Sequence, residues 1–249
     1  MPEGAGLAVT LVTALVAGLA RGFSGFGGAL IFIPVASASL GPTVAAPLLM
    51  LVDNVLAVPM VPRAWARLGR AGLREIGTLV AGALLGAPLG TWVLTRGDPA
   101  ALRWAMCTLV LAMLVLLASG WRYRGAERPW ISVSVGALSG LFSGTAQMGG
   151  PPVVAYWLGG AIPAERVRAN IVLFFAASGL ISFFAYLAAG LLDTALLGIA
   201  LTVAPAYATG LWLGARLFPL ASEAQFRRAC LGLIGLAGLI GLPVWDRLW

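Results

Sequence analysis

The feature that most limits the fold of this sequence is a long apolar stretch, residues 4–40, interrupted by the glycine-rich segment 21–28. A related interruption, residues 142–152, follows about 120 residues later. Inside a bilayer, backbone groups that leave helical hydrogen bonding are tolerated only where protein buries them or where they line a cavity. Broken helices at corresponding places in two halves of a membrane protein are typical of transporter substrate sites. The two interruptions therefore predict a membrane protein with a substrate site at its broken helices.

The composition favours the same class. Hydrophobic residues make up 60% of the 249 residues and charged residues only 10%, so nearly every apolar run must face lipid or pack inside a helical bundle. The net charge of +7 comes from 16 arginines against 9 acids, with no lysine. The arginines fall in short clusters between apolar runs, which is typical of orientation signals rather than of a nucleic-acid surface. We therefore expect an all-α polytopic membrane protein that binds no nucleic acid.

The apolar runs form two halves of four blocks each. Arginine, proline and glycine bound these blocks at about residues 5–40, 43–62, 73–95, 100–119, 130–161, 167–190, 194–218 and 228–245. Gly90 and Arg103 in the first half recur as Gly214 and Arg227 in the second, at an offset of 124 residues. This degenerate duplication predicts an internal repeat. The predicted divisions are a first transmembrane repeat at residues 1–120, a cytoplasmic linker at 121–129 and a second transmembrane repeat at 130–249.

The first and fifth blocks are too long for one straight span. Roughly 35 residues at about 1.5 Å each would reach some 50 Å, against about 30 Å of hydrocarbon. Two legs of about 15 residues joined at the glycine break would suit a re-entrant hairpin or a pair of short half-helices. Two complete short crossings would leave the sidedness of the following loops unchanged. We therefore expect each half to open with a broken or re-entrant helical hairpin.

The arginines distinguish between these layouts. Arg21 lies inside the first block, and eight single crossings would divide the other fifteen 8 against 7, which carries almost no orientation signal. If blocks one and five each enter and leave on the same side, only Arg96, Arg103 and Arg247 lie opposite the other twelve. Those twelve are Arg63, Arg67, Arg70, Arg74, Arg122, Arg124, Arg128, Arg166, Arg168, Arg216, Arg227 and Arg228. The second layout obeys the positive-inside rule and makes the halves antiparallel, so we expect an inverted-topology repeat with both chain ends outside.

The first break offers an anion site. Its candidate residues are Arg21, Ser24, Gly25, Gly27 and Gly28. Glycines there allow positive φ and bring backbone N–H groups close to a ligand, and the leg that restarts near Ala29 would present its positive end. The Arg21 guanidinium would contact the anion or, alternatively, extend to the membrane interface.

The second break offers more side-chain donors. Its candidate residues are Ser143, Gly144, Thr145, Gln147, Gly149 and Gly150. Pro151 and Pro152 follow, where a first helical turn has no N–H partner to lose. The alternative is that the glycines only permit close helix crossings.

Three further polar residues belong to the candidate set. Asp53 and Asn54 lie in the middle of the second block, and Asp53 is the only acid well inside a predicted span. Asp53 could pair with Arg21, carry a proton or remain neutral and hydrogen-bonded. Asn170 enters the sixth block, where solvent contact or a capping role competes with substrate binding. We expect no metal and no cofactor, because the chain has no histidine.

The residues of the two breaks resemble those of a known family. Residues 22–28 followed by Pro34, together with 140–144, 149–152 and Tyr156, are similar to the sulfite exporter TauE/SafE family of bacterial permeases. The resemblance covers essentially the whole chain and implies movement of small anions such as sulfite, sulfoacetate or related sulfonates across the inner membrane. It carries no catalytic residue to this chain. The glycines of the two breaks and the N-termini of the half-helices that follow them would fit a carboxylate equally well.

These observations predict a secondary carrier that exports a small anion by alternating access at a midplane site in the cell inner membrane. An anion channel and a carrier of small carboxylates stay open as alternatives, as does the coupling ion, a proton or sodium. An enzyme is disfavoured, because a Ser–His dyad is excluded without histidine. An aspartyl dyad would need Asp53 to meet Asp193, which lies in a loop between blocks.

Overall fold

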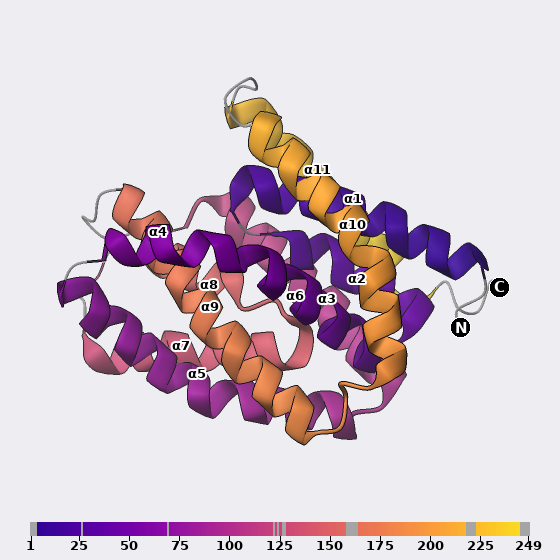
Figure 1. The fold of residues 1–249 in the computed structure, drawn as a ribbon, viewed down its shortest axis with the longest axis horizontal. Coiled ribbons are helices and arrows are strands. Elements are labelled where there is room, and N and C mark those ends of the chain that lie inside the picture. Colours follow the sequence, from indigo (N-terminus) through magenta and orange to yellow (C-terminus); the bar gives the residue numbers. More distant parts are fainter. Residues whose placement is uncertain are drawn as a thin grey trace. The chain divides into compact units, whose positions relative to one another are not determined.

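The computed structural model describes residues 4–25, 27–68, 70–121, 123, 125, 128–157, 164–217 and 223–244, and Figure 1 shows their fold. This part of the chain is helical, with no strand in it. Every predicted apolar block corresponds to a helix or to a broken pair of helices. The unbroken helices are α3 (Pro42–Ala57), η1 (Val58–Met60), α4 (Val61–Ala66), α5 (Arg70–Arg96), α6 (Pro99–Ser119), α9 (Ala164–Ala188), α10 (Thr194–Leu217) and α11 (Glu223–Ile240).

Blocks one and five are broken as the sequence predicts. The first gives α1 (Gly4–Ser24) and α2 (Gly28–Leu40), and the fifth gives α7 (Pro129–Ala146) and α8 (Gly150–Trp157). The legs are unequal, with 21 and 13 residues in the first pair and 18 and 8 in the second. The expectation of two legs of about 15 residues was therefore wrong, because α1 continues through Arg21 and Gly22 and ends only at Ser24.

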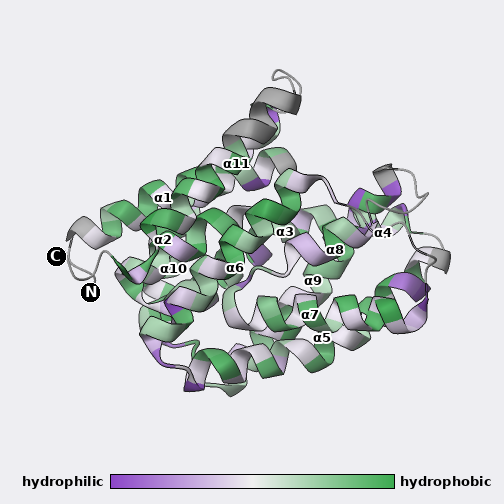
Figure 2. Ribbon diagram, turned by 180° about the vertical axis from the view of Figure 1, so that it is seen from behind, coloured by the Kyte–Doolittle hydropathy of each residue, from purple (hydrophilic) through white to green (hydrophobic). Residues whose placement is uncertain are grey.

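Six helices in the described residues are long and apolar enough to cross a membrane. They are Gly6–Phe23, Pro42–Ala66, Gly72–Arg96, Pro99–Ser119, Arg166–Ala188 and Thr194–Leu217. Most residues of the long helices carry the hydrophobic colour in Figure 2, and large apolar side chains such as Leu85 and Leu201 are exposed. A chain with this many apolar, outward-facing helices is a multi-pass membrane protein.

The chain divides into two compact units, and each takes helices from both predicted halves. Unit 1 comprises Met1–Val52, Arg96–Ser119 and Leu191–Trp249, and unit 2 comprises Asp53–Thr95 and Gly120–Gly190. Unit 1 therefore holds α1, α2, α6, α10 and α11, whereas unit 2 holds α4, α5, α7, α8 and α9. Each unit contains one of the two broken pairs.

In unit 1, α1 and α10 cross at very close range over small residues. A Cβ added to Gly18 would lie 2.2 Å from the Tyr207 carbonyl oxygen, and one added to Gly22 would lie 2.0 Å from that of Leu211. Gly210 and Gly214 of α10 face α1 in the same way. Backbones approach this closely in membrane bundles only where small residues line the crossing.

Unit 2 contains the same crossing, made by α5 and α7, which Figures 1 and 2 show side by side. Added Cβ atoms on Gly86 and Gly90 would lie 2.0 and 2.2 Å from the carbonyl oxygens of Ala137 and Leu141. Gly86 and Gly90 precede Gly210 and Gly214 by 124 residues, and Gly140 and Gly144 follow Gly18 and Gly22 by 122. The internal duplication is thus visible in the packing, where a first leg of one half crosses the third block of the other.

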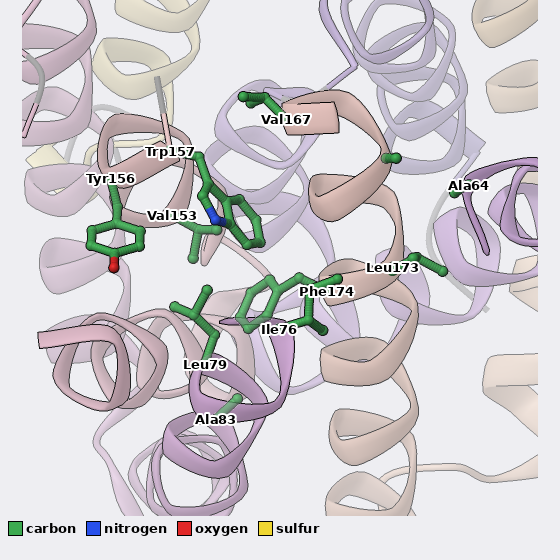
Figure 3. Packing of buried hydrophobic residues seen from close by; sticks show 11 residues of the cluster. Ala64, Ile76, Leu79, Ala83, Val153, Tyr156, Trp157, Val167, Leu173 and Phe174 are labelled. Carbon is green, nitrogen blue, oxygen red and sulfur yellow. The ribbon is translucent and has the colours of Figure 1, made fainter. Parts of the chain in front are cut away.

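Unit 2 also has an apolar core that positions α8. Trp157 and Phe174 face each other with ring centroids 6.1 Å apart, in an edge-to-face arrangement. Figure 3 shows Ile76 and Leu79 of α5 beside this pair. Trp157 and Phe174 are almost completely buried, so α8 is fixed between α5 and α9 although it has only 8 residues.

Candidate functional site

The first break is closed by backbone geometry and by one arginine. Gly25 and Gly27 have φ angles of 77° and 93°, in the left-handed region that favours glycine. The Gly25 N–H donates to the Arg21 carbonyl over 2.9 Å, and the Arg21 guanidinium donates to the Gly25 carbonyl. Arg21 therefore satisfies a carbonyl at the end of α1, where a cation is also favoured by the helix dipole. Its predicted contact with an anion stays a prediction.

The second leg of this pair begins at Gly28, one residue from the predicted restart, with Gly27 as its N-cap. A Cβ added to Gly28 would lie 2.9 Å from both the Ala17 carbonyl oxygen and the Tyr207 hydroxyl. The beginning of α2 is therefore pressed against α1 and α10. Ser24 is the last residue of α1, and its side chain lies outside the described part of the chain.

The second break depends on Gln147, which has a φ of 55° and ends α7. A left-handed conformation costs a non-glycine residue about 1–2 kcal/mol. Hydrogen bonds offset this cost, since the Gln147 N–H donates to the Ser143 carbonyl over 2.9 Å. The Gln147 side-chain amide donates to the same carbonyl over 2.9 Å and to the Tyr186 hydroxyl over 3.2 Å. The glutamine thus belongs to the structure of the break as well as to the candidate donors.

Tyr186 of α9 completes this cap. Its hydroxyl donates toward the carbonyls of Ser143 and Gly144 over 3.1 and 2.9 Å, and its side chain is fully buried. The last carbonyls of α7 have no partner within their own helix, so a buried hydroxyl from another helix supplies one. Sequence reasoning missed Tyr186, because nothing local links it to a break about 40 residues earlier.

Gly149 is confined by two serines. The Ser139 hydroxyl donates to the Gly149 carbonyl over 2.6 Å. A Cβ added to Gly149 would lie 2.2 Å from the Ser143 hydroxyl oxygen and 2.4 Å from the Ser139 carbonyl oxygen. No side chain fits there unless the break itself moves.

Gly144 and Thr145 serve the helix crossing. A Cβ on Gly144 would lie 2.1 Å from the Ala87 carbonyl oxygen of α5. The Thr145 hydroxyl donates to the carbonyls of Leu141 and Gly90, over 2.9 and 3.2 Å. Both residues thus contribute to the contact between α5 and α7, as the close-crossing alternative predicts.

The positive end of α8 is sparse in donors. α8 begins at Gly150, and Pro151 and Pro152 in its first turn carry no N–H. At the beginning of α2, by contrast, residues 28–31 all carry an N–H, and that of Leu30 donates to the Gly27 carbonyl. An anion near the second break therefore needs side-chain donors in addition to the backbone.

Such donors lie on α9, in the same unit. Ser178 and Ser182 are 2% and 0% exposed, and neither hydroxyl has a hydrogen-bond partner within the described structure. They are four residues apart and continue, after four more, to Tyr186, so all three lie near one face of the helix. Buried hydroxyls in helices commonly bond to the carbonyl four residues earlier, as those of Thr10 and Thr91 do here. Ser178 and Ser182 were not among the predicted site residues.

Asn54 lies against the same stretch of α9. A Cβ added to Gly179, which is adjacent to Ser178, would lie 2.3 and 2.5 Å from the Asn54 amide oxygen and nitrogen. Asp53 precedes Asn54 on α3 and is half-buried. The structure thus brings Asn54 to the helix that carries Ser178, Ser182 and Tyr186.

A second polar cluster surrounds Glu75, which sequence reasoning also missed because it stands at the edge of the third block. The Trp157 indole N–H donates to one Glu75 carboxylate oxygen, and the Asn170 amide nitrogen lies 3.5 Å from the other. Asn170 is fully buried, and its amide oxygen has no partner within the described residues. This candidate residue is therefore inside the protein, although its place at the beginning of a block suggested solvent contact.

The predicted site residues thus fall into two groups. Those of the first break, Arg21, Gly25, Gly27 and Gly28, belong to unit 1. Unit 2 contains Asp53, Asn54, Ser143, Gly144, Thr145, Gln147, Gly149, Gly150 and Asn170. In unit 2, α9 connects most of them, because Tyr186 bonds to the break, Gly179 contacts Asn54, and Asn170 begins the same polar face.

Apolar spanning helices together with a broken helix in each compact unit define a multi-pass membrane protein of a type common among transporters. The particular family follows from comparison with known proteins. The family model of the sulfite exporter TauE/SafE matches residues 10–240, and the chain belongs to this family. It is a transporter family, and membership implies an anion of the sulfite or sulfonate type as cargo. No curated protein and no solved structure matches the chain.

Proposed function

We propose that this protein is a secondary carrier that exports a small sulfur oxyanion, such as sulfite or a sulfonate, from the cell by alternating access at a midplane site. The observation that supports this most directly is the presence of one broken helix in each compact unit. Alternating access needs two bodies that can move as wholes, and a substrate site needs backbone and side-chain groups released from helical bonding. In this proposal the membrane is the inner membrane, and the arginine-rich loops face the cytoplasm.

The oxyanion would be bound by neutral donors in unit 2. Ser178 and Ser182 have hydroxyl protons that no described group accepts, and the Asn54 amide lies against the glycine between them. A buried hydroxyl without a partner is costly, so its presence near a break favours a ligand that accepts its proton. A sulfonate is tetrahedral and sulfite is pyramidal at sulfur, and the oxygens of either can accept several such hydrogen bonds at once. A carboxylate has about four lone-pair positions and could accept the same donors, so we favour the sulfur oxyanion because of the family to which the chain belongs.

The repeats are proposed to lie in inverted orientation, with residues 1–120 and 130–249 as the two repeats and 121–129 as a cytoplasmic linker. The matched glycine crossings at offsets of 122 and 124 residues support the duplication. For coupling, Asp53 and Glu75 are the acids that lie within candidate spans. A proton carried by either carboxylate would link export to the proton gradient.

The test is transport by purified protein in liposomes. Labelled sulfite outside should accumulate by counterflow when unlabelled sulfite is loaded inside, and the flux should saturate. Gly149→Val should abolish this flux, because its Cβ would collide with the Ser143 hydroxyl and the Ser139 carbonyl. Gly27→Val should do the same, because valine at a φ of 93° would reshape the first break.

Gly198→Val provides the matched control, since a Cβ at Gly198 meets nothing within 4 Å. All three variants are scored only if they insert and elute as monodisperse protein in detergent. Wild-type flux in both break variants would remove the breaks from the mechanism. Flux that rises linearly with concentration and shows no counterflow would favour the alternative, an anion channel.

A further inference from the structure

A pocket of about 330 Å³ lies in unit 2 between α4 and α9, two helices that contact each other. Its lining includes Pro59, Met60, Arg63, Arg67, Arg168 and Val172. Ala64 and Ala169, both buried, complete the wall where α4 and α9 meet. None of these residues belongs to the breaks or to the polar face of α9 that contains Ser178 and Ser182.

The charge of this pocket has one sign. Its lining contains three arginines and no acid. The arginine side chains are exposed, so each guanidinium can reach a ligand. Guanidinium groups bind phosphate oxygens in a planar, bidentate fashion, and several around one pocket define an anion site.

The other residues that line the pocket are apolar. Exposed apolar residues also lie just before Pro59 in the sequence. Pro59 and Met60 form the wall on one side, and Val172 forms it on the other. Val55 and Val58, just before them, are 67% and 62% exposed. A soluble anion would gain nothing from such a surface, whereas an acyl chain would.

The pocket also lies at the membrane boundary. The candidate span that contains α3 and α4 ends at Ala66, and the span of α9 begins at Arg166. Trp65, next to the pocket on α4, is 60% exposed, which is typical of residues at the level of lipid head groups. Both span ends are rich in arginine, as expected of the cytoplasmic side.

We propose that this pocket binds the phosphodiester of an anionic phospholipid such as phosphatidylglycerol. Arg63, Arg67 and Arg168 hold the phosphate, and the glycerol and upper acyl chain lie on Pro59, Met60 and Val172. Basic pockets between helices on the cytoplasmic side of a membrane protein suit lipid head groups of this kind. The lipid would connect α4 with α9, the helix that also contacts the second break. This proposal does not depend on the transported substrate.

The experiment measures lipid retention by purified protein. Wild-type protein in detergent is mixed with phosphatidylglycerol or with phosphatidylcholine, and bound lipids are counted by native mass spectrometry while thermal unfolding is followed in parallel. We expect one phosphatidylglycerol to be retained and to raise the unfolding temperature, with no such effect of phosphatidylcholine. Arg63→Gln/Arg168→Gln should weaken retention about tenfold or more, since each arginine near an anionic surface contributes roughly a fivefold factor.

Arg74→Gln/Arg128→Gln is the matched control. It removes the same charge from exposed arginines of the same unit that do not line the pocket, so retention should stay at the wild-type level. Met60→Glu, a change at an exposed wall residue, gives a second and independent disruption by placing a negative charge beside the phosphate. Equal retention in the pocket variants and in the control would overturn the proposal. Stabilisation by glycerol 3-phosphate or inorganic phosphate equal to that by the lipid would overturn it too, and would assign the pocket to a soluble anion.

Discussion

At the scale of single residues, the buried hydroxyls of this protein differ in whether they have a hydrogen-bond partner. Those of Thr10, Thr13 and Thr91 donate to the carbonyl four residues earlier in their own helices. Those of Ser178 and Ser182 have no partner within the described structure. The difference matters because a satisfied hydroxyl contributes about 1 kcal/mol, whereas an unsatisfied one costs about 1–3 kcal/mol. Buried hydroxyls that carry such a cost are candidates for binding a ligand.

This contrast gives a prediction in which stability and function change in opposite directions. Ser178→Ala/Ser182→Ala should leave the unfolding temperature unchanged or raise it, because two buried hydroxyls without partners are removed. The same change should raise the concentration of sulfite needed for half-maximal flux about tenfold or more, because the proposed oxyanion loses two donors. Thermal unfolding in detergent and liposome flux measure the two effects.

Ser132→Ala is the control for this prediction. Ser132 is also buried, but its hydroxyl lies 2.8 Å from the Tyr156 hydroxyl, so the substitution leaves a buried phenol without that partner. It should lower stability by about 1–2 kcal/mol and leave the flux parameters of the remaining folded protein unchanged. Loss of stability in the double variant, with unchanged flux, would assign Ser178 and Ser182 to packing alone.

At the scale of helices, glycines determine which pairs can touch. Gly86 and Gly210 occupy matching places in the two crossings, where an added Cβ would lie 2.0 and 2.1 Å from a backbone oxygen of the facing helix. Gly77 and Gly198 lie on the same two helices, α5 and α10, with nothing within 4 Å. The glycines of one helix are therefore not equivalent, and the structure separates those that are needed from those that are not.

We predict that Gly86→Ala and Gly210→Ala each lower stability by about 2 kcal/mol, because the methyl group forces two backbones apart. Gly77→Ala and Gly198→Ala should instead be neutral or stabilising by up to about 1 kcal/mol, because alanine favours the helix. Unfolding temperatures of the four variants, purified in one detergent, test this. Similar losses at all four positions would show that helix propensity rather than close crossing determines the outcome.

The sequence predicted these elements well for a physical reason. Glycine clusters around Gly25, Gly27 and Gly149 determine the broken helices locally, so their positions could be predicted without knowing the fold. Tyr186, Glu75 and Ser182 could not be identified in this way. Tyr186 and Glu75 matter because they bond to residues far away in sequence, and Ser182 because its hydroxyl has no partner in the described structure. No local sequence pattern distinguishes these three from ordinary residues of an apolar helix.

At the scale of the whole molecule, the topology is defined by the side of the membrane on which each loop lies. Two layouts account for the apolar blocks, and they differ only in whether blocks one and five return to the side from which they entered. The helix lengths fit both layouts, because α1 is long enough to span whereas α2 and α8, with 13 and 8 residues, are too short to cross the bilayer alone. The arginine distribution favours the return, since that layout places twelve arginines on one side of the membrane and three on the other.

Labelling of single cysteines decides between the layouts. In a Cys107→Ala/Cys230→Ala background, we predict that Leu68→Cys and Arg166→Cys react with an impermeant maleimide only in inside-out vesicles. Ala100→Cys and Ala189→Cys should react only in intact cells, because one membrane crossing separates each from its predicted cytoplasmic neighbour. Eight single crossings would instead place position 166 with 100 and position 189 with 68. That pairing would make the halves parallel, and the inverted repeat on which the proposed alternating access depends would have to be abandoned.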